Sequence, residues 1–333
     1  MGFLLAIFLL FFIYFGGIKL KIKMQKKEKE KTFKDAFKEF ILYSRVKNLA
    51  DATLNYYEES YQQFLDFFGE GKLCHEINDK TINEYILYMQ SHTKCNPTTI
   101  NTRIRGLRAI LYYMMKLGYI EKFHITIRKS EKKIKTTYTE SELKLLLKKP
   151  DIKHCAFYEY RSWVISNTLL GTGMRAGSLC NLKINDVDFE NLVFYLRHMK
   201  ARRQIIIPMV ITLKKILLEY LEYRQATKDD DFLFCSVYGM QLNTNSLAHS
   251  LRKYSLRRGV TKSGLHKYRH TYAKMYLQNG GDVFKLQKLL GHRTLDMTRE
   301  YVEMFTDDLK VDYDIINPLE HLQANKKQIT IKK

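Results

Sequence analysis

The spacing of hydrophobic and polar positions divides the chain into two mainly helical regions joined by a charged segment. In residues 33–122, apolar residues recur at helical spacing and predict four helices: Phe33–Tyr43, Asp51–Phe68, Asp79–Met89 and Pro97–Leu117. Asn96 can cap the fourth helix, and Pro97 suits its first turn. We expect these helices to pack into one domain.

The second region begins after a charged run. Residues 123–137 include a stretch from Lys129 to Lys135 with a single apolar residue, which predicts a linker. Residues 138–310 then form the second domain, where Thr139 and Glu142 predict a capping box for a helix that ends at Leu147. Two β-rich runs within residues 193–208 predict a hairpin. The expected fold class is mainly α with a small antiparallel sheet.

The first residues follow a different pattern. Phe3–Phe15 is an unbroken apolar run of 13 residues, short of the about 20 that a spanning helix needs. Residues 1–23 therefore have three interpretations: a membrane tether, a signal-like segment, or an extension upstream of a translation start at Met24. We expect a cytoplasmic protein, and membrane contact stays open.

The charge balance adds a partner. The chain has 56 Lys plus Arg against 35 Asp plus Glu, so its formal charge is 56 minus 35, or +21. Such an excess attracts double-stranded DNA and other polyanions. Arg105 and Arg108, three positions apart on the fourth predicted helix, are candidates for contacts with backbone phosphates, although a solvated face explains them equally well. Aromatic residues make up 13% of the chain, which argues against a disordered basic tail.

Metals and cofactors have no support in the sequence. The five cysteines are scattered and show no C-x-x-C spacing, so neither a disulfide framework nor a zinc site is expected. There is no Walker-type glycine loop and no carboxylate cluster suited to two metal ions. We therefore expect no cofactor and no metal.

A set of polar residues near the C-terminal end carries the candidate chemistry. Arginine grips phosphate oxygens, histidine moves protons near neutral pH, and a tyrosine hydroxyl can form a covalent ester with phosphorus. Two more basic residues lie upstream, one after the turn at Gly173 and one near the hairpin tip. The full set is Arg175, Lys200, His266, Arg269, His292 and Tyr301. These side chains are the parts needed to break a phosphodiester without a metal ion.

In their order and spacing these residues resemble the tyrosine recombinase family, also called the phage integrase family. The resemblance rests on five elements: Thr172–Arg175, Lys200 eight residues before Pro208, His266-x-x-Arg269, Leu289–His292, and Tyr301 nine positions after His292. It covers the chain from about Phe33 to about Lys310. One departure is visible, because Ser178 stands where the family usually has an acidic residue.

The resemblance implies a two-domain architecture, with a helical SAM-like core-binding domain and a catalytic domain, and a site-specific recombinase of the Xer-like kind. Arg175 and Arg269 would clamp the phosphate, and His292 would add a hydrogen bond. Tyr301 would attack phosphorus and form a 3′-phosphotyrosine. His266 is the expected acceptor of its proton, and Lys200 the donor to the leaving 5′ oxygen.

The expected partners follow from the same resemblance. They are double-stranded DNA, a homotetramer on a synapsed DNA pair that forms through the C-terminal tail (311–333), and accessory directionality factors. Within this tail, Leu319 and Leu322 have helical spacing, although a frayed terminus is the alternative. We expect integration and excision of a mobile element.

Several alternatives remain open. They are Xer-type chromosome or plasmid dimer resolution, DNA inversion, a monomeric type IB topoisomerase-like nickase-ligase, and a DNA-binding or membrane-tethered regulator without catalysis. The Ser178 departure gives the last of these some support.

Two further polar residues are expected to be structural. If residues 264–278 form a helix, His270 points about 100° away from Arg269 and so away from the site. Asp282 is expected to be the N-cap of the next helix.

Overall fold

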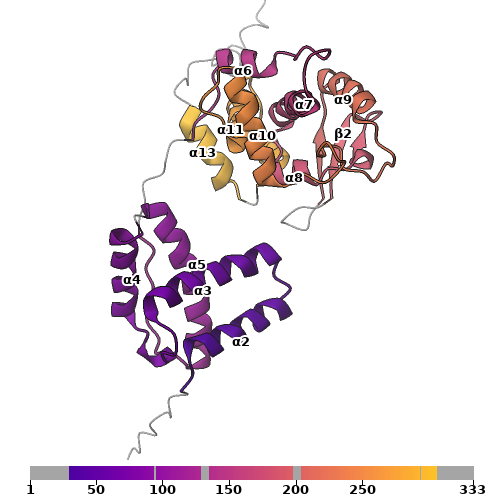
Figure 1. Ribbon diagram of the computed structural model, residues 1–333. Helices are drawn as coiled ribbons and strands as arrows, with labels where there is room; N and C mark the ends of the chain where they lie inside the picture. Colours follow the sequence, from indigo (N-terminus) through magenta and orange to yellow (C-terminus); the bar gives the residue numbers. More distant parts are fainter. Residues whose placement is uncertain (1–29, 94, 129–134, 198–203, 293, 306–333) are drawn as a thin grey trace, which may run out of the picture. The chain divides into compact units, whose positions relative to one another are not determined.

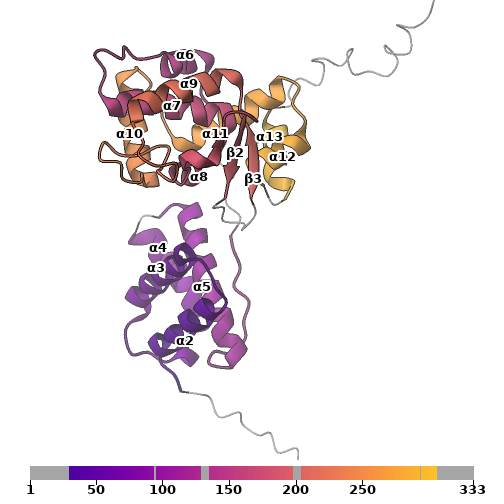
Figure 2. The same cartoon turned by 90° about the vertical axis from the view of Figure 1, so that its right-hand side faces the viewer.

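The computed structural model describes residues 30–93, 95–128, 135–197, 204–292 and 294–305 (Figure 1). It divides into two compact units, residues 1–132 and 133–333. Figures 1 and 2 show both units, and each is described by itself. The expected N-terminal segment (1–23) and C-terminal tail (311–333) lie outside the described residues.

The first unit is helical. Its elements match the predicted segments, and α2 and α4 extend a few residues beyond the predicted ends. They are α2 (Phe33–Val46), α3 (Asp51–Phe68), the short η1 (Cys74–Glu76), α4 (Asp79–Ser91) and α5 (Pro97–Leu117). The Asn96 side chain accepts the N–H of Thr99, which confirms the predicted cap.

Aromatic rings fill much of the first core. The rings of Phe37 and Tyr61 stack with centroids 3.8 Å apart. Ile125 is 2% exposed within this core, and the Asn101 side-chain amide donates to the carbonyl of Arg128 at 2.8 Å. Residues 123–127, the start of the expected linker, therefore still pack on this core through alternate apolar side chains.

The second unit contains helices and one small sheet, and its helix at Glu140–Leu147 is capped by Thr139 and Glu142 as predicted. The elements are α6 (Glu140–Leu147), α7 (Phe157–Thr172), α8 (Ala176–Cys180), η2 (Ile184–Asp186), β1 (Val187–Asp188), β2 (Val193–Leu196), β3 (Ile205–Pro208), α9 (Ile211–Arg224), α10 (Thr244–Arg257), α11 (Leu265–Gln278), α12 (Val283–Leu290) and α13 (Asp296–Phe305). The expected fold class is confirmed.

The sheet has the order β1-β2-β3 and is antiparallel throughout. Phe194 on β2 pairs with Ile207 on β3, so the predicted hairpin is confirmed. β1 was not predicted, because a two-residue strand has no alternating pattern to recognise.

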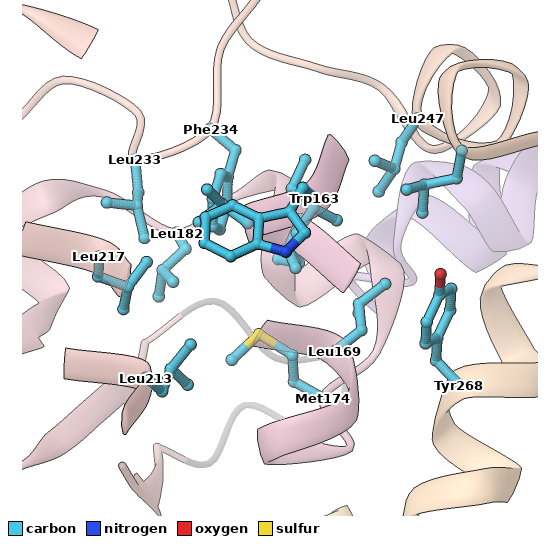
Figure 3. Close-up of a cluster of buried hydrophobic side chains, with 14 of the residues drawn as sticks. Trp163, Leu169, Met174, Leu182, Leu213, Leu217, Leu233, Phe234, Leu247 and Tyr268 are labelled. Atoms are coloured by element: carbon cyan, nitrogen blue, oxygen red, sulfur yellow. The ribbon is translucent and has the colours of Figure 1, made fainter. Parts of the chain in front are cut away.

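The second core surrounds α7, which is buried along most of its length. Figure 3 shows Trp163, Leu169 and Met174 packed together, with Tyr268 beside them. The Tyr268 hydroxyl lies 2.9 Å from the Ser166 hydroxyl, so α11 is fixed against α7. This packing determines where the polar side chains of α11 lie.

Among the described residues, no helix combines the length and the apolar character needed to cross a bilayer.

Candidate active site

Arg175 is positioned by the end of α7. This helix ends at Gly173, whose φ of 61° is the left-handed conformation that glycine adopts without strain. Arg175 follows as the N-cap residue of α8, and its Nη2 donates to the carbonyl of Gly291 at 3.3 Å. Burial lowers the pKa of the Arg175 guanidinium, which still carries its charge at neutral pH.

We expect Gly173→Ala to lower the free energy of unfolding of the second unit by about 2 kcal/mol or more. The added Cβ would lie 2.3 Å from Cδ1 of Tyr272, and an L residue is strained at this φ. Urea unfolding measures the loss. Gly177→Ala is the matched control, because nothing lies within 4 Å of its Cβ position. Equal stability of the two variants would contradict this account of Gly173.

Arg269 is the most buried charged group of the site, with 6% exposure. Its Nη1 donates to the carbonyl of Gly173 at 2.8 Å, and its Nη2 donates to the carbonyl of Leu290 at 2.7 Å. Burial and the nearby charge of Arg175 lower the pKa of Arg269 to about 10. The side chain therefore remains charged at neutral pH and joins the ends of α7 and α12.

His292 follows the end of α12 and lies next to Arg269. Its Nε2 is 3.0 Å from Nη2 of Arg269, and its Nδ1 is 2.8 Å from Oγ1 of Thr298. A guanidinium can only donate, so Nε2 accepts and Nδ1 carries the hydrogen. Burial, followed by the positive charges of Arg269 and Arg175, lowers the pKa of His292 to about 4. The ring is neutral at pH 7.

Tyr301 lies on α13 and is 2% exposed. It packs in a small cluster of buried apolar residues: Ala273, Leu286 and Leu290. Its ring is nearly parallel to that of His292, with centroids 6.3 Å apart. Burial raises the pKa of the Tyr301 hydroxyl, and the positive charges of Arg269 and Arg175 oppose this rise. The arginine charges thus favour the phenolate that a nucleophile must form.

His270 is the residue that contacts the tyrosine, and the expectation that it points away from the site is wrong. Its Nδ1 lies 2.8 Å from the Tyr301 hydroxyl. His266 is exposed, and its ring is 6.3 Å from the ring of His270. Among the described contacts, none joins His266 to Tyr301. Arg269 and His270 differ by about 100° about the axis of α11. Both directions lie within the face of α11 that α13 covers, so both side chains reach the tyrosine.

Lys135 also reaches this site, although no sequence pattern predicted it. Its ammonium lies 4.5 Å from the centroid of the Tyr301 ring and 2.5 Å from a carboxylate oxygen of Glu300. The residue comes from the segment before α6, far from α13 in sequence. Periodicity within one segment carries no signal for such a contact, and only a prediction of the packing between segments could have found it.

The remaining candidates lie elsewhere. Lys200 is outside the described residues. Arg105 and Arg108 lie on α5 of the first unit, and neither forms a salt bridge with another described residue. Ser178 lines a small hollow with Asp186, whose carboxylate pairs with Nε of Arg197 at 2.9 Å. A carboxylate therefore lines the same hollow as residue 178, although residue 178 is not acidic.

One other prediction has a structural outcome. The Asp282 side chain accepts the N–H of Lys285 at 2.8 Å, which confirms it as the N-cap of α12. Within the described ranges, no group of three His, Cys, Asp or Glu side chains is arranged to hold a metal ion.

We expect the stability of the second unit to fall as the pH decreases from about 6.5 to about 4. The pKa values of His270 and His292 are both lowered from 6.5 to about 4. In this interval the unfolded chain binds protons that the native site does not, so protonation favours unfolding. Urea unfolding at a series of pH values measures the slope. His292→Gln should reduce the dependence of the free energy of unfolding on pH. An unchanged dependence would show that it does not arise from protonation of His292.

Comparison with known proteins identifies the class of this site. The model of the phage integrase family matches residues 136–307, and the model of the phage integrase N-terminal SAM-like domain matches residues 36–119. The chain therefore belongs to the phage integrase family. It is a tyrosine recombinase of the Xer type, a class of enzymes that cleave and religate DNA.

Individual relatives agree with this assignment. The chain is 26% identical over 287 residues to tyrosine recombinase XerC of Oceanobacillus iheyensis, covering 82% of this chain and 93% of the relative. It is 29% identical over 290 residues to XerC of Staphylococcus aureus, covering 84% and 94%. A lambda integrase tetramer bound to a Holliday junction has the same fold, with TM-score 0.66 and 17% identity over 82% of this chain and 78% of that chain.

Proposed function

We propose that this protein is a site-specific recombinase in which Tyr301 attacks a DNA phosphodiester bound between Arg175 and Arg269. The observation that carries the proposal is the placement of a buried tyrosine hydroxyl beside Arg269 and His270. The product is a 3′-phosphotyrosine and a free 5′ hydroxyl. Attack by the hydroxyl of another strand reverses the step, so neither ATP nor a metal ion is required.

The roles of the site residues follow from charge. Negative charge grows on the non-bridging oxygens as phosphorus becomes pentacoordinate, and preorganised cations stabilise it. Arg175 and Arg269 supply these cations. Their guanidinium groups donate to backbone carbonyls, which holds them in place. His292 adds a polar contact, and Lys200 protonates the leaving 5′ oxygen.

The biological role is a finer proposal. We infer integration and excision of a mobile element, carried out by a homotetramer on two DNA duplexes that assembles through residues 311–333, with accessory directionality factors. The tetramer of lambda integrase on a Holliday junction supports the assembly. Arg105 and Arg108 on α5 would contact DNA backbone phosphates. The reaction takes place in the cytoplasm, and residues 1–23 add membrane contact if they act as a tether.

A second role has specific support. The XerC relatives from two organisms fit the alternative role, Xer-type resolution of chromosome or plasmid dimers. Supercoiled plasmids that carry two copies of a DNA site cleaved by the protein separate both of these roles from the topoisomerase alternative. Strand exchange between the sites supports a recombinase, whereas relaxation without exchange supports a nickase-ligase.

A covalent capture experiment tests the proposal. The protein is incubated in EDTA with a pool of randomised DNA duplexes, both intact and nicked, and denatured. Covalent protein–DNA adducts are then isolated and sequenced. Mass spectrometry of the adduct should locate the nucleotide on Tyr301. No adduct from the randomised pool or from genomic DNA fragments would overturn the proposed function.

A further inference from the structure

The contact between His270 and Tyr301 places a ring nitrogen beside the nucleophile, because Nδ1 lies 2.8 Å from the phenol oxygen. Arg269 can only donate, so it does not compete for the phenol hydrogen, and its charge opposes the rise that burial causes in the pKa of the Tyr301 hydroxyl. In the neutral tautomer with its hydrogen on Nε2, Nδ1 of His270 offers a lone pair to the proton that the nucleophile must lose.

We propose that His270, and not His266, accepts the proton of the Tyr301 hydroxyl during strand cleavage and returns it during religation. This inference rests on the proposed function, since it concerns the same nucleophile. His266 makes no described contact with Tyr301, and its side chain is exposed. His270 touches the reacting oxygen and is therefore a catalytic residue.

The step balances. The O–P bond forms between Tyr301 and the scissile phosphorus while the phenol proton moves to Nδ1 of His270, which becomes an imidazolium. The bond from phosphorus to the 5′ oxygen breaks, and this oxygen takes a proton from Lys200. Religation reverses both transfers, with the imidazolium protonating the departing phenolate.

The surroundings of His270 keep its ring neutral before DNA binds. Burial is the main reason that the pKa of His270 is lowered to about 4. Lys135, His266 and Arg269 contribute to this lowering, and the carboxylate of Glu300 opposes it. A bound phosphodiester adds negative charge to this group, which raises the pKa of His270 toward its ordinary value. The phenol also becomes much more acidic as its oxygen bonds to phosphorus.

Two substitutions separate proton transfer from positioning. In His270→Asn, the amide oxygen can occupy the place of Nδ1 and keep the hydrogen bond without accepting a proton. In His270→Ala, both functions are lost. His154→Asn is the matched control, because His154 is exposed and contacts Asp151 outside the site. Thermal unfolding of each variant shows that it is folded.

The readout is the single-turnover rate of adduct formation on the duplex selected by covalent capture. A second duplex has sulfur in place of the bridging 5′ oxygen. A thiolate leaves without protonation, so this duplex bypasses the proton donor. We expect His270→Asn and His270→Ala to slow adduct formation on both duplexes by about 10²-fold or more, the usual contribution of a general base. Lys200→Ala should be slow on the oxygen duplex alone, and His154→Asn should match the wild type.

Several outcomes would overturn the inference. His270→Asn rates within about threefold of the wild type on both duplexes would show that no proton passes to this residue. Rescue of His270→Asn by the sulfur duplex would place its action at the leaving group. Full activity of His270→Asn with loss in His270→Ala would reduce the residue to positioning.

A measurement on the wild-type protein keeps the inference testable if the variants do not fold. Nitrogen chemical shifts of the labelled histidines report which ring nitrogen carries hydrogen. An unprotonated Nδ1 at His270 in the DNA-free protein supports the inference, whereas a protonated Nδ1 would overturn it. Failure of the wild type to form any adduct is a different result, because it removes the proposed function itself.

Discussion

Tyr301→Phe should abolish the covalent protein–DNA adduct while leaving the protein folded and able to bind DNA. The substitution removes one oxygen, the hydroxyl that lies 2.8 Å from Nδ1 of His270 and near the charge of Arg269. Adduct formation after denaturation, measured beside DNA binding by gel shift, checks the result. We expect no adduct at any enzyme concentration that saturates the DNA.

The stability of this variant should change little. Nδ1 of His270 loses its hydrogen-bond partner, which costs about 1 kcal/mol, while the packing of the ring against Leu286 and Leu290 is kept. Tyr272→Phe is the matched control, because Tyr272 lies in the same cluster on α11 and has no assigned part in the chemistry. Adduct formation by Tyr301→Phe would assign the nucleophile to another residue.

Arg269→Lys should slow adduct formation by about 10³-fold and also lower the free energy of unfolding. A lysine has a single nitrogen on a flexible chain, so it cannot hold the carbonyls of Gly173 and Leu290 together as the guanidinium does. At least one buried carbonyl is left without its donor, at a cost of about 1–3 kcal/mol. Single-turnover cleavage and urea unfolding measure the two effects.

Arg161→Lys is the control that separates the effect of Arg269→Lys on the cleavage rate from its effect on stability. Arg161 is also buried and donates to a backbone carbonyl, that of Cys235, but it lies outside the site. This control should lose stability and keep its cleavage rate under conditions in which it is folded. If Arg269→Lys cleaved at the rate of this control, the proposed phosphate clamp would be contradicted.

Local patterns in the sequence were enough to predict most helices of the first unit and the hairpin of the second. Asn96 and Asp282 each begin a helix through a bond to a backbone N–H three residues on, so their role is decided within one turn. The family resemblance likewise pointed to residues that the fold brings together, since Arg175, Arg269 and His292 lie close to Tyr301.

The contacts made by His270 and Lys135 could not be found in this way. Both depend on how α13 packs against distant segments, and a helical wheel of α11 gives the direction of a side chain without showing which neighbour covers it. Arg269 is the last residue of a recognisable motif, His266-x-x-Arg269. His270 follows this motif directly and is not part of it, so the sequence alone shows it only as a polar residue next to Arg269. The distinction between them required the position of the tyrosine in three dimensions.

The order of the site residues along the chain has a consequence during synthesis. Arg175 leaves the ribosome 301 minus 175, or 126, residues before Tyr301. A nascent chain can therefore fold its first unit long before α13 exists. If Tyr301 is the nucleophile, as proposed, such a chain cannot yet cut DNA. Strand cleavage then waits until Arg175, Arg269 and His292 have all been made.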